Sequence, residues 1–158
     1  MILGGFDLMK ENPQDKKIQQ NLQPGELSAE GFLGEDKRSF FAIIEEDEST
    51  LEKLELTKEQ VADRLQYFTD LAFESFDGAL IIDEKYEVRY FSVRGKLICP
   101  FGHPGVFRKG QITLQNLQNS HRIVWTPLNI HLIREHGFFE GKNSKHRLEP
   151  VFLKETIF

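Results

Sequence analysis

The sequence lacks most of the features from which a protein's function is usually inferred. Only one of its 158 residues is a cysteine, Cys99, so no intrachain disulfide can form, as is usual in a reducing compartment. No apolar run approaches the roughly 18 to 20 residues that cross a membrane. The first residues carry neither the basic nor the apolar region of a secretory signal. We therefore expect a soluble, cytoplasmic protein with no membrane partner.

No motif in the chain specifies a reaction. There is no glycine-rich strand-to-helix turn of the kind that cradles a phosphate. No pair of acidic residues has the spacing of a glycosidase or phosphatase site. The sequence therefore favours a binding or regulatory role over catalysis.

The composition is that of one ordinary globular domain. Hydrophobic residues make up 39% of the chain and charged residues 28%, which is enough to bury a normal core. Residues 1–35 differ, because Gln, Asn, Lys, Pro and Gly surround scattered apolar residues without a sustained period. We interpret them as an extended or loosely docked N-terminal arm. The remaining residues, 36–158, are expected to form a single α+β domain.

Charge is distributed unevenly along the chain. Residues 1–78 hold 18 acidic and 8 basic side chains, whereas residues 79–158 hold 7 acidic and 12 basic ones and all five histidines. The basic half could bind a small molecule or anion. Alternatively, the two halves attract each other, within one fold or between the subunits of a homodimer or another protein complex. The second interpretation is favoured.

Two helices are predicted in the acidic half. Apolar residues near helical spacing favour a helix over residues 36–54, although residues 40–44 alone could equally form a strand. Thr57 and Gln60 then form a capping box, and apolar residues at helical spacing continue to about Phe76, with Asp77 and Gly78 as the stop.

The start of that second helix resembles the first helix of bacterial helix-turn-helix DNA-binding domains, with the pattern Leu56-Thr57-x-x-Gln60-x-Ala62-x-x-Leu65. The resemblance covers only residues 54–65. No glycine-containing turn follows, and the acidic residues further along the helix would meet DNA phosphates with like charge. DNA is therefore an unlikely partner.

After Gly78 the spacing of apolar residues changes from the helical period to an alternation of every second residue. Residues 79–83, 86–93, 96–101, 111–117 and 121–125 read as five short strands, and residues 148–153 as a sixth, edge strand. Short connections imply an antiparallel meander. The predicted fold is therefore α+β, with a five- to six-stranded antiparallel sheet packed against the helix after Thr57 and a short C-terminal helix.

That C-terminal helix is predicted over residues 127–136. Thr126 is a good N-cap and Pro127 suits the first helical position. Gly137 supplies the left-handed residue that ends the helix. At about 100° per residue, His136 falls on the inward face and His131 on the outward face.

The histidines and the cysteine suggest, but do not specify, a metal site. Cys99, His103, His131 and His136 would make a Cys/His₃ set for zinc. However, two histidines that chelate one ion from a helix usually lie four residues apart, and a spacing of five separates them by roughly 140°. No cofactor is therefore the favoured expectation, and zinc is the alternative.

Cys99 also has a packing interpretation and a catalytic one. As a strand residue alternating with Leu97 it would simply be buried, which is favoured. As a thiolate nucleophile it would need His103 or His136 as its base. Asn129 is too far from His136, roughly 10 Å along the helix, to orient that base. The dyad Cys99 and His136 is thus an alternative only.

We expect a ligand cleft between the 99–110 loop and the helix over residues 127–136. Its expected ligand-binding residues are His103, Arg108, Asn129, Arg134 and His136. The polar 142–147 loop is basic as well, and a solvated surface is the favoured interpretation of it. A metal- or thiol-dependent enzyme that uses Cys99, His103, His131 and His136 is the alternative to a binding module.

Overall fold

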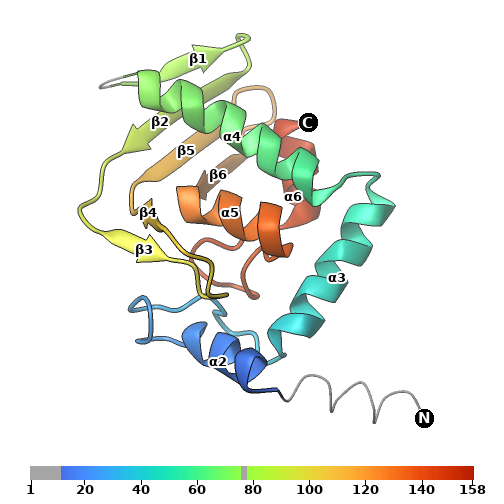
Figure 1. Ribbon diagram of the computed structural model, residues 1–158. Helices are drawn as coiled ribbons and strands as arrows, with labels where there is room; N and C mark the ends of the chain where they lie inside the picture. Colours follow the sequence, from blue (N-terminus) through green and yellow to red (C-terminus); the bar gives the residue numbers. More distant parts are fainter. Residues whose placement is uncertain (1–11, 76–77) are drawn as a thin grey trace.

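The computed structural model describes residues 12–75 and 78–158 and confirms an α+β fold with an antiparallel sheet (Figure 1). Its helices are α2 (Pro13–Asn21), α3 (Phe40–Lys53), α4 (Lys58–Glu74), α5 (Pro127–His136) and α6 (Pro150–Ile157). Its strands are β1 (Leu80–Ile82), β2 (Tyr86–Phe91), β3 (Lys96–Ile98), β4 (Val106–Arg108), β5 (Gln111–Asn116) and β6 (Arg122–Trp125). Within the described ranges, no helix has both the length and the apolar character of a membrane span.

Four strands form one antiparallel sheet in the order β1-β2-β5-β6. Val88 of β2 pairs with Leu114 of β5, and Ile112 of β5 pairs with Trp125 of β6. All four side chains are buried, and α4 and α5 lie across the sheet in Figure 1. We call this cluster the sheet core. The predicted capping box at Thr57 is confirmed at the start of α4.

A second apolar cluster, here called the hairpin core, lies beside the sheet core. β3 and β4 form a separate two-stranded hairpin, and α2 and the start of α3 also contribute to the cluster. Its buried members are Ile18, Leu22, Phe32, Leu33, Phe40, Ile43, Cys99, Leu128, Leu132 and Phe138.

The described part of the N-terminal segment is not an extended or loosely docked arm. Asn12 caps α2 through a hydrogen bond from the Asp15 amide, and Pro13 occupies the first turn. Ile18 and Leu22, four residues apart, then reach the hairpin core. Because only these two apolar residues mark the buried side of α2, composition alone did not reveal it. Residues 1–11 lie outside the described residues.

The strand predictions need three corrections. Residues 148–153 are not an edge strand, because α6 begins at Pro150 and buries Leu153 and Ile157, which are four residues apart. The 99–110 loop contains the short strand β4. The meander is interrupted, since β2 pairs with β5 while β3 pairs with β4. The predicted helix stop at Asp77 lies outside the described residues.

Helix α5 separates the two cores. Thr126 caps it, accepting a hydrogen bond from the Asn129 amide, and Gly137 ends it with a φ of 64°; both boundaries are confirmed. Ile130 and Ile133 belong to the sheet core, whereas Leu128 and Leu132 belong to the hairpin core. α5 is therefore covered on more than one side.

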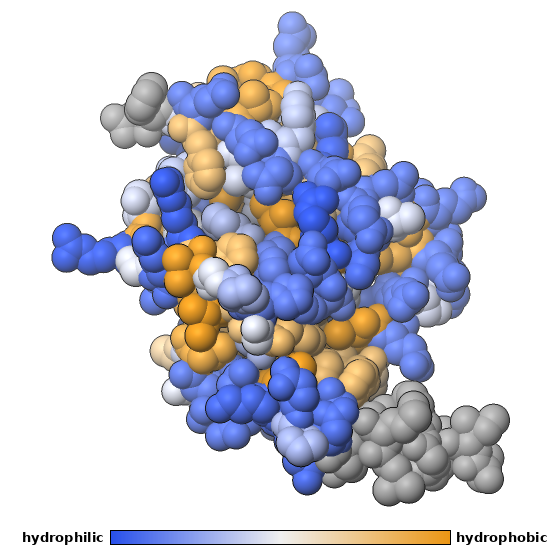
Figure 2. Space-filling model, viewed as in Figure 1, coloured by the Kyte–Doolittle hydropathy of each residue, from blue (hydrophilic) through white to orange (hydrophobic). Residues whose placement is uncertain are grey.

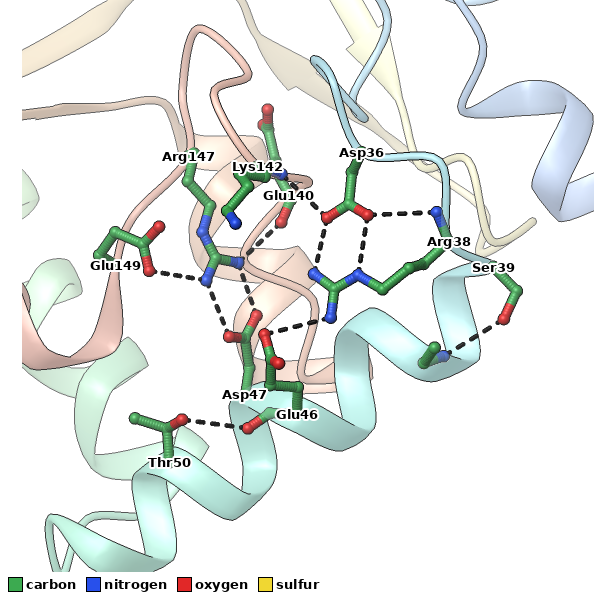
Figure 3. A network of polar contacts seen from close by, with 11 residues as sticks. Asp36, Arg38, Ser39, Glu46, Asp47, Thr50, Glu140, Lys142, Arg147 and Glu149 are labelled. Carbon is green, nitrogen blue, oxygen red and sulfur yellow. Dashed lines mark hydrogen bonds and ion pairs between the residues drawn. The ribbon is translucent and has the colours of Figure 1, made fainter.

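A buried ion pair ties α3 to the C-terminal loop (Figure 3). Both terminal nitrogens of Arg147 donate to the Asp47 carboxylate, at 2.6 and 2.8 Å, and one also donates to the backbone oxygen of Glu140 at 2.8 Å. Glu149 accepts a further bond at 2.9 Å. Arg147 is thus a structural cation, and the 142–147 loop is not a uniformly solvated basic surface.

The face of the molecule shown in Figure 2 is mostly hydrophilic. On the face shown in Figure 2, apolar side chains appear in patches between hydrophilic ones. The most exposed large apolar residues among those described are Val106 and Phe91, at 58% and 55%. Isolated exposures of this kind are normal for a globular protein and do not by themselves mark a site.

Candidate metal site

Cys99, His131 and His136 converge where the β3–β4 hairpin meets α5. Cys99 follows β3 directly, and both histidines lie on α5. One potential ligand atom from each residue lies within 4.8 Å of the other two. The distance between Cys99 Sγ and His136 Nε2 is 3.5 Å. Three residues that can ligate a metal therefore face one point.

The prediction that His131 faces outward is wrong. The His131 and His136 rings lie with centroids 5.3 Å apart, although five residues separate them. The reason is that the β3–β4 hairpin forms a second layer over this side of α5. The ring of Phe107 on β4 packs against the His131 ring, with centroids 4.8 Å apart. The helical wheel placed His131 away from the sheet core, but that side of α5 is covered by the hairpin.

His103 lies at the solvent side of the same cluster. Its ring centroid is 4.5 Å from that of His136 and 5.2 Å from that of His131, and the residue is exposed. Gly102 and Gly105, with φ of 91° and 107°, flank its loop, in a conformation that favours glycine. The loop thus brings a third imidazole, and a fourth potential ligand, beside the three converging residues.

Burial keeps the two helical imidazoles neutral near pH 7. Burial, followed by the charges of His103, His131 and Lys58, lowers the pKa of His136 to about 4. Burial and then the charge of His103 also lower the pKa of His131. A neutral imidazole has a free lone pair, which is the form that binds a metal.

The surroundings of Cys99 fix the orientation of the site. The backbone amide of Phe101 donates to Cys99 Sγ at 3.3 Å, a contact that would also stabilise a thiolate. The Phe101 ring stacks on His136 with centroids 4.1 Å apart and an interplanar angle of 9°. Cys99 is only 3% exposed, as its packing interpretation predicted, but it lies just after β3 and not within a strand.

The distance between Cys99 and His136 fits a tetrahedral ion. With Zn–S near 2.3 Å and Zn–N near 2.0–2.1 Å, a tetrahedral angle separates sulfur from nitrogen by about 3.6 Å. The Cys99–His136 distance of 3.5 Å agrees with this value, although a thiol–imidazole hydrogen bond would have a similar length. The His131 Nε2 atom favours the ion, because it is buried without a hydrogen-bond partner in the described structure. A simple Cys–His hydrogen bond does not account for that atom.

The other predicted ligand-binding residues do not join this cluster. Arg134 pairs with Asp63 on α4 at 2.6 Å. The Asn129 side-chain amide donates to Glu140 at 2.8 Å. The guanidinium of Arg108 lies 5.8 Å from the centre of the Phe73 ring. Of the five predicted residues, the structure brings together His103 and His136, where β4 of the 99–110 loop packs on α5.

Sequence reasoning did not single out Glu140. Its side chain is 5% exposed, and its carboxylate accepts hydrogen bonds from Asn129 and Ser144 at 2.8 and 2.7 Å. Burial raises its pKa to about 7 against the effect of these bonds. No spacing in the sequence marks a buried carboxyl of this kind, because its partners come from a helix and a loop.

No protein-family model matches this chain, and no curated protein or solved structure shows significant similarity to it. The functional argument therefore depends on the geometry of the site.

Proposed function

We propose that this protein is a metal-binding module in which Cys99, His131 and His136 hold a zinc ion. The observation that carries the proposal is the convergence of these three ligand types within 4.8 Å, with the His131 Nε2 atom buried and unpaired in the described structure. One thiolate with neutral imidazoles is a donor set that suits zinc.

His103 is proposed as the fourth ligand. It is exposed, its ring already lies beside both helical histidines, and a rotation of its side chain would direct a nitrogen toward them. Four protein ligands leave no open position, as in structural zinc sites. The ion would then fasten the β3–β4 hairpin to α5, and its role would be structural rather than catalytic.

Metal titration of the purified, chelator-treated protein tests this proposal. Zinc and cobalt should bind with a stoichiometry of one, and cobalt should give the absorption bands of a tetrahedral thiolate complex. Cys99→Ser, His131→Gln and His136→Gln should each abolish tight binding, and His103→Gln should weaken it. His121→Gln is the matched control, because His121 bonds to Thr156 at 3.2 Å, outside this cluster. Unaltered metal affinity in the three ligand variants would refute the site.

The short Cys99–His136 distance also supports a second candidate, a thiol nucleophile with His136 as its base. However, the Cys99 side chain is buried, which makes the thiol less accessible to a substrate. Alkylation of metal-free protein by iodoacetamide across a pH series separates the two candidates. An apparent thiol pKa well below 8.5, together with no metal binding, would favour the nucleophile. Protection of Cys99 by one equivalent of zinc would favour the metal module.

A further inference from the structure

A cavity of about 350 Å³ lies beside the hairpin core, away from the four proposed metal ligands. Its lining residues come from the 28–32 segment, from the region of the neighbouring strands and from the 140–146 region. At roughly 30 Å³ for each non-hydrogen atom, as in liquid water, it can hold about a dozen such atoms. This size is at the lower end for pockets that bind small molecules.

The walls of this cavity combine an apolar surface with two ammonium groups. Phe32, Leu97 and Leu128 supply apolar contact, while Lys109 and Lys145 line the same space. Phe32 and Leu128 are buried members of the hairpin core, so this part of the wall is preformed. A ligand with an apolar body would bury that body here.

Lys109 and Lys145 share the cavity lining with the carboxyl groups of Glu30 and Glu140. Lys145 is 3.9 Å from Glu30, and both side chains are largely exposed, so this pair is weak. Lys109 has no ion-pair partner among the described residues. The buried Glu140 carboxyl already accepts two hydrogen bonds from protein groups. The ammonium group of Lys109 is thus the charge left for a ligand to neutralise.

We infer that this cavity binds a small organic monoanion with an apolar body, such as a medium-chain or aromatic monocarboxylate. The apolar portion lies against Phe32 and Leu128, and the anionic group lies toward Lys109 and Lys145. This inference is independent of the zinc proposal, because no proposed metal ligand lines the cavity.

Calorimetric titration with octanoate tests the inference on the full, folded chain. Octanoate should bind with a stoichiometry of one, and both octanol, which lacks the charge, and acetate, which lacks the apolar body, should bind at least about tenfold more weakly. Lys109→Met and Lys145→Met should each weaken octanoate binding about fivefold. Lys53→Met, at the end of α3 and outside the cavity lining, is the matched control and should change nothing.

Val93→Trp supplies a second test, because Val93 lines the cavity yet is 44% exposed, so the change should preserve folding while narrowing the space. It should reduce octanoate affinity about tenfold. Absence of octanoate binding, equal binding of octanol, or full affinity in both lysine variants would overturn the inference. Cys99→Ser should retain octanoate binding, so a failed metal site and a failed anion site give different results.

Discussion

The sheet core and the hairpin core are built from different kinds of sequence. The sheet core combines a long amphipathic helix, α4, with strands of four to six residues such as β2, β5 and β6. The hairpin core combines a helix with little apolar character, α2, two three-residue strands and irregular segments. Long helices and strands bury residues at a regular spacing, so the sequence predicts the sheet core. The hairpin core has no such regular spacing, so the sequence does not predict it.

Polar contacts between distant residues compensate in the hairpin core. Asn21 donates from its side chain to the Pro100 carbonyl at 3.0 Å, and the Phe40 amide donates to the side chain of Gln19 at 2.9 Å. The Gly141 amide donates to the Phe32 carbonyl at 2.8 Å. The proposed zinc ion would add one more such connection. The sheet core also contains a buried polar bond, from Trp125 to Thr69 at 2.8 Å, but it has in addition the continuous apolar face of α4.

The largest effect is expected from breaking the buried ion pair between Arg147 and Asp47. Arg147→Met should reduce the free energy of unfolding by roughly 3–5 kcal/mol, because it leaves a carboxylate that is 4% exposed without its partner. The double variant Asp47→Leu, Arg147→Met should recover much of this loss. Urea unfolding measures both.

Arg134→Met is the matched control for that pair. Arg134 contacts Asp63 at 2.6 Å, as close as Arg147 contacts Asp47, but the Asp63 side chain is 70% exposed. Its loss should cost at most about 1 kcal/mol. Equal losses of unfolding free energy in Arg147→Met and Arg134→Met would show that burial adds nothing to the contribution of the Arg147–Asp47 ion pair.

Matched truncations in the two cores should differ in which amides they expose. Leu22 and Leu65 are both fully buried, so each change to alanine should cost about 2–5 kcal/mol. In Leu22→Ala, hydrogen exchange should accelerate in α2 and the β3–β4 hairpin while β5 stays protected. In Leu65→Ala, exchange should accelerate throughout the sheet. Identical exchange patterns would mean that both cores unfold as one unit.

The same contrast explains which parts of the molecule were predictable. The caps at Thr126 and Thr57 act through neighbouring residues, so local sequence predicted them correctly. The position of His131 depends on the hairpin that covers it, and that hairpin includes β4, too short to show an alternation. The start of α6 has a local signal, since Pro150 occupies its first turn, but the short apolar run that follows resembles a strand equally well. The sequence does not favour the metal cluster, because a helical wheel does not include the second layer of the fold.

The pH dependence of stability tests the buried carboxyl beside the hairpin core. The pKa of Glu140 is raised by burial from 4.5 to about 7, so the folded state binds this proton more tightly than the unfolded state does. Stability from this group is fully present below pH 4.5 and is lost as pH rises through about 7, by roughly 3 kcal/mol. Glu140→Gln should remove that loss.

Urea unfolding of both proteins at pH 5 and pH 8 gives the comparison. The variant should gain stability relative to the original protein between pH 5 and pH 8, because its neutral amide cannot ionise. Its oxygen can still accept the hydrogen bond from Asn129. His131 and His136 titrate in both proteins, so their effects cancel in the difference. A difference that does not change with pH would show that Glu140 remains ionised in the folded protein.

The smallest loss of stability is expected from substitutions of Gly137, after which successive residues enter different cores. After Gly137, Phe138 enters the hairpin core and Phe139 enters the sheet core, and the φ of 64° at Gly137 sets that divergence. A Cβ atom there would meet Ile44 and Lys58 at 3.7 Å, which is ordinary contact.

Gly137→Ala should therefore cost only the backbone strain of a left-handed alanine, about 1 kcal/mol. Gly137→Asn should cost less, because asparagine tolerates this conformation. Thermal unfolding measures both changes, and hydrogen exchange reports where each acts. If the alanine variant loses protection in both cores, the residue couples them, as its position predicts. A loss of protection confined to one core would show that the phenylalanine of the other core keeps its position without the left-handed glycine at the end of α5.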